Sequence, residues 1–151
     1  MLRFITVITA LALALALPAI AAGPEQQSVR SAKPFQQMVD DLKASVASHK
    51  MLVVTTACAS CGAKGRGLVI PGNMVIGVYR NDFAVRMLEA DIDAGIEAPI
   101  RFYITENPDK TATLSWRKPS DVFAPYGNAG LTAMALELDG IFSVIAADAV
   151  K

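Results

Sequence analysis

The sequence has few of the residues on which most catalytic and metal sites depend. Its 151 residues include two cysteines and one histidine, and fourteen basic side chains balance fourteen acidic ones. With a single histidine and no Gly-x-Ser-x-Gly motif, a serine hydrolase has no support. A near-neutral chain has no general electrostatic attraction for nucleic acid, so we expect no nucleic-acid partner.

The first 21 residues have the pattern of a secretory signal peptide. Arg3 supplies a positive charge, residues 4–17 are almost continuously apolar, and Ala19 and Ala21 are small residues at the positions that a signal peptidase reads. The apolar run is shorter than the roughly 20 residues that span a bilayer. We therefore predict cleavage after Ala21, a periplasmic or secreted protein, and no membrane insertion after cleavage.

The remaining chain has the length of a single domain. Residues 22–27 are polar and contain Gly, Pro and Gln, which is typical of a flexible leader. The mature chain of roughly 130 residues is long enough for one hydrophobic core. We therefore place a single domain at residues 28–151.

Hydrophobic periodicity predicts the order β-α-β-β-α-β-β-α, an α+β domain with a mostly antiparallel sheet and helices on one face. Continuous apolar runs at residues 51–56 and 74–79 indicate buried central strands. The other predicted strands are residues 28–32, 100–105 and 111–117, and the helices are residues 34–49, a segment after Asn81 that ends before Gly95, and residues 131–150.

The predicted hairpin of residues 100–117 has two unlike faces. Trp116 shares one face with Leu114, which favours packing in the core. Tyr103 lies on the opposite face, together with Arg101, Thr113 and Ser115. This polar face is suited to a dimer contact or a shallow pocket.

The two cysteines form a Cys-x-x-Cys motif at Cys58 and Cys61. Such a pair suits a disulfide in an oxidising compartment, dithiol–disulfide chemistry, or part of a soft-metal site. Lys64 and Arg66 follow within residues 62–67, a glycine-rich stretch that predicts a flexible connecting loop. A purely structural bond across so few residues would stabilise the fold only slightly. Redox chemistry would use the positive charge of Lys64 and Arg66 to favour a thiolate.

A metal site would need ligands besides the two thiolates. Copper or zinc is the metal that such soft ligands would suit. His49, Met51 and Met74 are the further candidates. However, His49 lies at the predicted end of a helix, where a cation is favoured by the helix dipole, so an ordinary surface cap is the simpler interpretation.

Several segments resemble the bacterial family called domain of unknown function 302. They are the helix from Pro34, residues 51–56, residues 67–79, Ala98-Pro99-Ile100-Arg101, residues 115–119, and Tyr126 before the last helix. The resemblance implies a fold similar to the TATA-box-binding-protein-like class, often as a homodimer. It implies no established reaction.

The chain departs from the family pattern where its cysteines lie. The resemblance implies an Asp-His pair where Cys58 and Ala59 stand, and a Phe-Gly-Asn-Pro stretch where residues 77–80 read Gly-Val-Tyr-Arg. The sequence therefore favours an exported binding or accessory domain that holds a soft metal or a sulfur ligand through Cys58 and Cys61. The alternative is a periplasmic thiol–disulfide oxidoreductase or sulfur carrier that uses the same pair.

Overall fold

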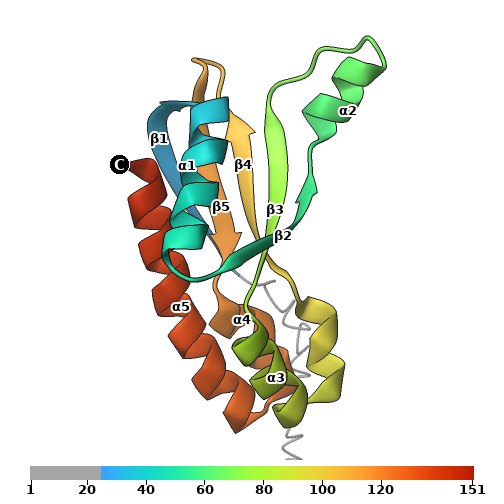
Figure 1. Cartoon of the computed structure of the whole chain (residues 1–151), viewed down its shortest axis with the longest axis vertical. Helices are drawn as coiled ribbons and strands as arrows, with labels where there is room; N and C mark the ends of the chain where they lie inside the picture. The colour runs from blue at the N-terminus through green and yellow to red at the C-terminus, as the bar shows by residue number, and fades with distance from the viewer. Residues whose placement is uncertain (1–24) are drawn as a thin grey trace, which may run out of the picture.

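The computed structural model describes residues 25–151, which form one five-stranded sheet with helices (Figure 1). The strands are β1 (Gln26–Pro34), β2 (Leu52–Ala57), β3 (Asn73–Tyr79), β4 (Ile100–Glu106) and β5 (Thr111–Arg117). The α-helices are α1 (Phe35–Ser48), α2 (Ala59–Gly65), α3 (Asn81–Ala90), α4 (Pro119–Phe123) and α5 (Ala129–Val150). The 3-10 helices are η1 (Ile92–Glu97) and η2 (Ala124–Tyr126).

The sheet is antiparallel throughout, with the strand order β1-β5-β4-β3-β2. The predicted α+β class and the predicted hairpin are confirmed, since β4 and β5 are joined by a short turn and pair directly. Strand β1 begins at Gln26, two residues before the predicted start of the domain. The predicted signal peptide lies outside the described residues.

Helices α1 and α5 lie side by side on one face of the sheet (Figure 1). The predicted stripe of α1 is buried at Met38, Val39, Leu42 and Val46. Helix α5 contributes Phe142, whose ring stacks on that of Phe102 in β4 with centroids 4.7 Å apart. Burying a side chain of this size contributes about 1.5–3 kcal/mol, so this single covered face is the main source of stability.

Helix α5 passes the length and composition test for a membrane-spanning segment. Its buried side chains follow the helical period and face α1 and the sheet, so this helix serves as the central core helix of the described domain. It begins sharply because the Asn128 side chain accepts hydrogen bonds from the backbone N–H groups of Gly130 and Leu131.

The predicted central position of residues 51–56 is wrong. Strand β2 lies at the edge of the sheet, and only its partner β3 is an inner strand. Leu52 is 59% exposed and Val54 is 46% exposed. An apolar run predicts a strand but not its place in the sheet, and here β2 pairs with β3 alone before the chain leaves the sheet.

Within residues 25–151, no helix layer covers the centre of the sheet face opposite α1 and α5. Tyr103 and Ser115 pair across β4 and β5 on this face, and Tyr103 is 41% exposed. The next pair, Phe102 and Trp116, points to the core side, where the two rings lie 5.9 Å apart. The two faces predicted for the hairpin are therefore confirmed.

Substitution of a glycine in β3 tests how closely this sheet is packed. A Cβ atom at Gly77 would overlap Thr55 Oγ1 and lie 2.7 Å from Pro99 Cγ. We expect Gly77→Ala to destabilise the domain by about 1–3 kcal/mol, because it overpacks a rigid strand. Thermal and urea unfolding measure the change.

The matched control is Gly140→Ala in α5. Gly140 is exposed and a Cβ there meets nothing within 4 Å, so the same substitution should stabilise the domain by about 0.5–1 kcal/mol through helix propensity. Equal stability of Gly77→Ala and the unsubstituted chain would contradict the packing described for β3.

Candidate functional site

The two cysteines lie where the chain leaves β2 and enters α2. Their sulfur atoms are at bonding distance, with the Cα atoms 5.2 Å apart, so they form a disulfide. Cys58 is half-buried and Cys61 is exposed. The pair therefore stands at the surface, beyond the end of the edge strand and outside the hydrophobic core (Figure 1).

A short helix replaces the flexible loop that the glycines of residues 62–67 predict. Cys58 is extended and acts as the N-cap of α2, and its Sγ accepts a hydrogen bond of 3.0 Å from the backbone N–H of Cys61. The motif therefore begins a helix. The glycines that follow the motif predict a loop, whereas in the structure they end a helix.

The end of α2 explains the glycine-rich stretch. Gly67 is left-handed, with φ of 75°, and its N–H donates to the carbonyl of Lys64. The N–H of Leu68 reaches back to the carbonyl of Ala63 at 2.9 Å. These two bonds form a Schellman C-cap, in which glycine is favoured at the left-handed position.

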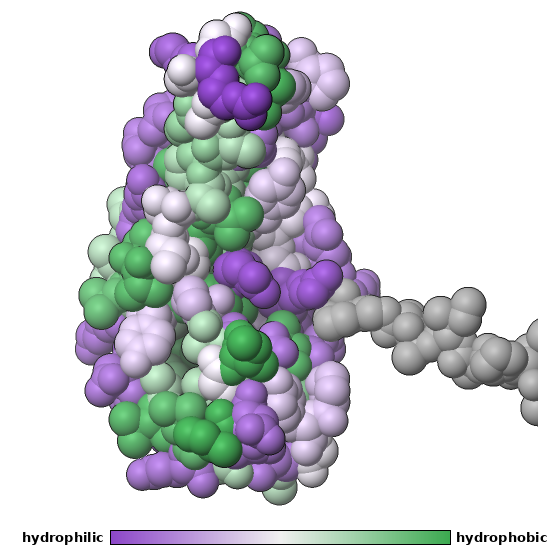
Figure 2. All heavy atoms as spheres, turned by 90° about the vertical axis from the view of Figure 1, so that its right-hand side faces the viewer, coloured by the Kyte–Doolittle hydropathy of each residue, from purple (hydrophilic) through white to green (hydrophobic). Residues whose placement is uncertain are grey.

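We call residues 58–72 the α2 arm. None of the residues of helix α2 is buried, and Val69 beyond it is 98% exposed. Figure 2 faces the side of the molecule that carries the arm and shows hydrophilic and apolar side chains together at its upper end. Ser60 ties the arm to the sheet, since its Oγ accepts from the N–H of Asn73 at 3.3 Å.

The predicted cations of the site lie on the same arm. Lys64 follows Cys61 by one helical turn, and Arg66 is the C-cap of α2. Both are exposed, and neither pairs with an acidic group within residues 25–151. Their charges act on the thiols through solvent, where screening weakens them, so the direct Cys61 N–H bond to Cys58 is the stronger local effect.

The far end of the arm is fixed by Gly72 and Glu106. The N–H of Gly72 donates to Glu106 Oε2 at 2.8 Å, and the N–H of Glu106 donates to the carbonyl of Gly72 at 2.7 Å. The Gly72 bond, together with the ammonium of Lys110 at 3.1 Å, holds the pKa of Glu106 below its usual value. Glycine is required here because a Cβ would lie 2.7 Å from the ring of Phe35.

His49 does not join the cysteines. It is the C-cap of α1, before β2 begins, whereas Cys58 follows the end of that strand. Its Nε2 lies 2.8 Å from Asp148 Oδ2 in α5, and Lys151 and then His49 lower the pKa of Asp148. Within the described part of the chain, no group of three or more Cys, His, Asp or Glu side chains is placed to hold a metal.

The fold and the arm define a class of α+β domain with one covered sheet face and a surface disulfide at the start of a short helix. The chain belongs to the domain of unknown function 302 family, whose model matches residues 27–146. A search of curated proteins found no match.

A similar solved structure supports the same fold. It is the crystal structure of an uncharacterized conserved protein of this family from Bacillus stearothermophilus, which is 14% identical in sequence. The similarity covers 83% of this chain and 98% of that chain, with a TM-score of 0.74.

The anchor of the α2 arm can be tested through pH. A carboxylate whose folded pKa is lowered stabilises the fold above its unfolded pKa, and the contribution is lost as pH falls through the folded pKa. We expect Glu106→Gln to lower Tm at pH 7, and the deficit to shrink below about pH 4.5 as the carboxylate of the unsubstituted protein becomes protonated.

The control for this measurement is Glu89→Gln. Glu89 is an exposed carboxylate of α3 that bonds to no other side chain within residues 25–151, so its substitution should leave Tm nearly unchanged. A deficit for Glu106→Gln that is constant from pH 7 to pH 3 would contradict a role for the charge.

Proposed function

We propose that this chain is an exported accessory domain that exchanges thiols and disulfides with a dithiol partner through Cys58 and Cys61. The observation that carries the proposal is the hydrogen bond from the Cys61 N–H to Cys58 Sγ on an exposed arm. A backbone N–H directed at sulfur favours the thiolate, which is both the nucleophile and the better leaving group. The apolar N-terminal segment supports export to a compartment where disulfides persist.

The geometry favours one order of steps. A partner thiolate attacks the exposed Sγ of Cys61, a partner–Cys61 disulfide forms, and the Cys58–Cys61 bond breaks with its electron pair going to Cys58. The Cys61 N–H stabilises the departing Cys58 thiolate. The second thiolate of the partner then attacks the partner's sulfur in the mixed disulfide. The partner's two sulfurs become bonded, and Cys61 leaves as a thiolate.

The exchange balances in atoms and electrons. The partner loses two electrons and two protons and becomes a disulfide, and Cys58 and Cys61 gain them and become thiols. The reverse sequence reduces a partner disulfide. The exposed Leu68, Val69 and Ile70 lie on the same arm and offer an apolar surface to a partner that approaches the pair.

The metal alternative has less support. Copper or zinc held by Cys58 and Cys61 needs further ligands, because a closed zinc site has four. His49 is bonded to Asp148 instead. The described residues therefore offer two of the required ligands, and the rest would have to come from another molecule.

The order of attack can be tested by trapping. The oxidised protein is incubated with glutathione, quenched in acid, alkylated with N-ethylmaleimide, and fragmented for mass spectrometry. We expect glutathione on Cys61 and N-ethylmaleimide on Cys58, because attack occurs at the exposed sulfur.

Single variants give the matched control. Cys58→Ser and Cys61→Ser each leave one thiol, and the Cys58 thiol of Cys61→Ser should react faster with iodoacetamide at pH 7 than the Cys61 thiol of Cys58→Ser. Glutathione on Cys58 would contradict the order of steps. Failure to form any mixed disulfide would contradict the proposed exchange.

A further inference from the structure

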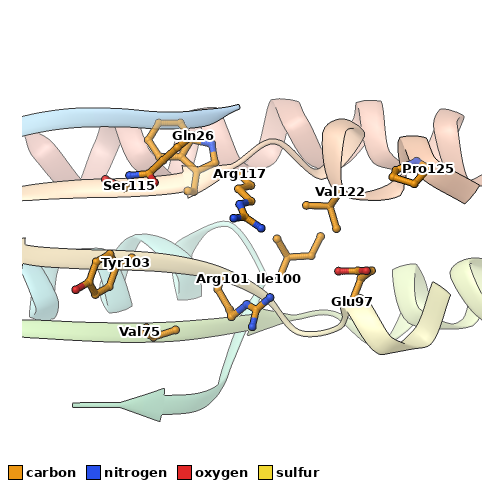
Figure 3. Close-up of a pocket in the computed structure, with 11 residues that line it drawn as sticks. Gln26, Val75, Glu97, Ile100, Arg101, Tyr103, Ser115, Arg117, Val122 and Pro125 are labelled. Atoms are coloured by element: carbon orange, nitrogen blue, oxygen red, sulfur yellow. The ribbon is translucent and has the colours of Figure 1, made fainter. Parts of the chain in front are cut away.

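One end of the sheet borders a cavity that the arm does not use. Its volume is about 520 Å³, within the range of small-molecule sites. It lies where β4 and β5 diverge toward η1, α4 and η2 (Figure 3). The lining side chains come from all these elements and from β1 and β3: Gln26, Val75, Glu97, Ile100, Arg101, Tyr103, Ser115, Trp116, Arg117, Val122 and Pro125.

Two arginines, Arg101 of β4 and Arg117 of β5, line this cavity. The pairing of β4 with β5 ends at Phe102 and Trp116. The next residues along the two strands are Arg101, which pairs with Gly77 of β3, and Arg117, which pairs with Gln26 of β1. Figure 3 shows Arg117 pointing from β5 toward β4, whereas Arg101 lies along β4 on the side of β3. Two guanidinium groups that line one cavity make it electropositive, which favours the binding of an anion.

No protein group within residues 25–151 supplies that anion. Neither Arg101 nor Arg117 forms an ion pair there. Glu97 also lines the cavity, but its Oε1 accepts a hydrogen bond of 3.2 Å from the hydroxyl of Tyr126. Burial and the nearby Glu97 carboxylate raise the pKa of Tyr126, so its hydroxyl stays a proton donor to Glu97. Two cations therefore face one carboxylate that is already bonded.

Most of the remaining lining residues are apolar or aromatic. Trp116 of β5 and Ile100 of β4 are part of the lining, and Val122 and Pro125 lie at the far end toward η2 (Figure 3). A small oxyanion would contact the arginines but not the apolar part of the lining. A ligand that has an aliphatic body and one carboxylate matches both parts, because guanidinium groups bind carboxylates through paired N–H donors.

We propose that this cavity binds a small amphipathic organic carboxylate, with its carboxylate held between Arg101 and Arg117 and its body against Trp116 and Ile100. The site is separate from the disulfide, so it adds a binding function to the proposed thiol exchange and does not depend on it.

The single tryptophan gives a direct readout. Trp116 is the only tryptophan of the sequence and lines the cavity, so its fluorescence should change in a saturable way when octanoate is added to the full mature protein. The matched probes are 1-octanol, which has the same body without the charge, and inorganic phosphate, which has the charge without the body. We expect neither to produce the saturable change at the same concentrations.

Substitution of the arginines locates the carboxylate. Arg101→Gln and Arg117→Gln should each weaken octanoate binding by about tenfold or more, since each removes a hydrogen bond between charged groups. Arg30→Gln is the control, because Arg30 lies on the same sheet face but pairs with Asp109 outside the cavity. Far-ultraviolet circular dichroism confirms that each variant is folded.

Each outcome decides the proposal. The proposal is supported if Arg101→Gln and Arg117→Gln lose octanoate binding and Arg30→Gln keeps it. If the double variant Cys58→Ser/Cys61→Ser also keeps octanoate binding, the cavity acts independently of thiol exchange. Equal responses to octanoate and 1-octanol would overturn it in favour of a nonspecific apolar surface. Binding of phosphate alone would overturn it in favour of a simple anion site, and no saturable change with any probe would also overturn it.

Discussion

The structure depends on the packing of two helices, α1 and α5, against a single face of the antiparallel sheet. The core contacts, from Met38 in α1 to Phe142 in α5, gather on that side. Because these contacts carry the stability, the opposite face and the far end of β2 do not have to be apolar. The α2 arm, with its disulfide, and the arginines of the cavity both lie outside the core.

This separation is consistent with the proposed thiol exchange, because the disulfide lies outside the core. The bond between Cys58 and Cys61 closes a loop of few residues, so it restricts the unfolded chain little, by about 2 kcal/mol on the chain-entropy model. The bond joins no two elements of the core, and residues of α2 are not buried. The arm is attached to the sheet by hydrogen bonds at Asn73 and Glu106, and neither bond involves a cysteine.

Much of this fold could be predicted from the sequence, and the failures have physical causes. The stripe of α1 and the hairpin of β4 and β5 follow from periodicity, which reports burial directly. The edge position of β2 could not be read from its apolar run, because strand order is decided by pairings distant in sequence. Helix α2 was missed because its C-cap uses Gly67, and glycine alone was interpreted as a loop. Of the site, the cysteine pair and the polar face with Arg101 and Tyr103 could be found, but the cavity also needs η1 and η2, which only the folded chain brings together.

In the proposed function, the Cys58–Cys61 disulfide exchanges with a partner and is not a purely structural bond. The most direct test is the reduction potential of the pair, measured by equilibrating the mature protein in glutathione buffers and alkylating the free thiols. We expect a potential between about −120 and −270 mV, the range of proteins that exchange disulfides. A potential below about −300 mV, typical of structural disulfides that resist reduction, would contradict it.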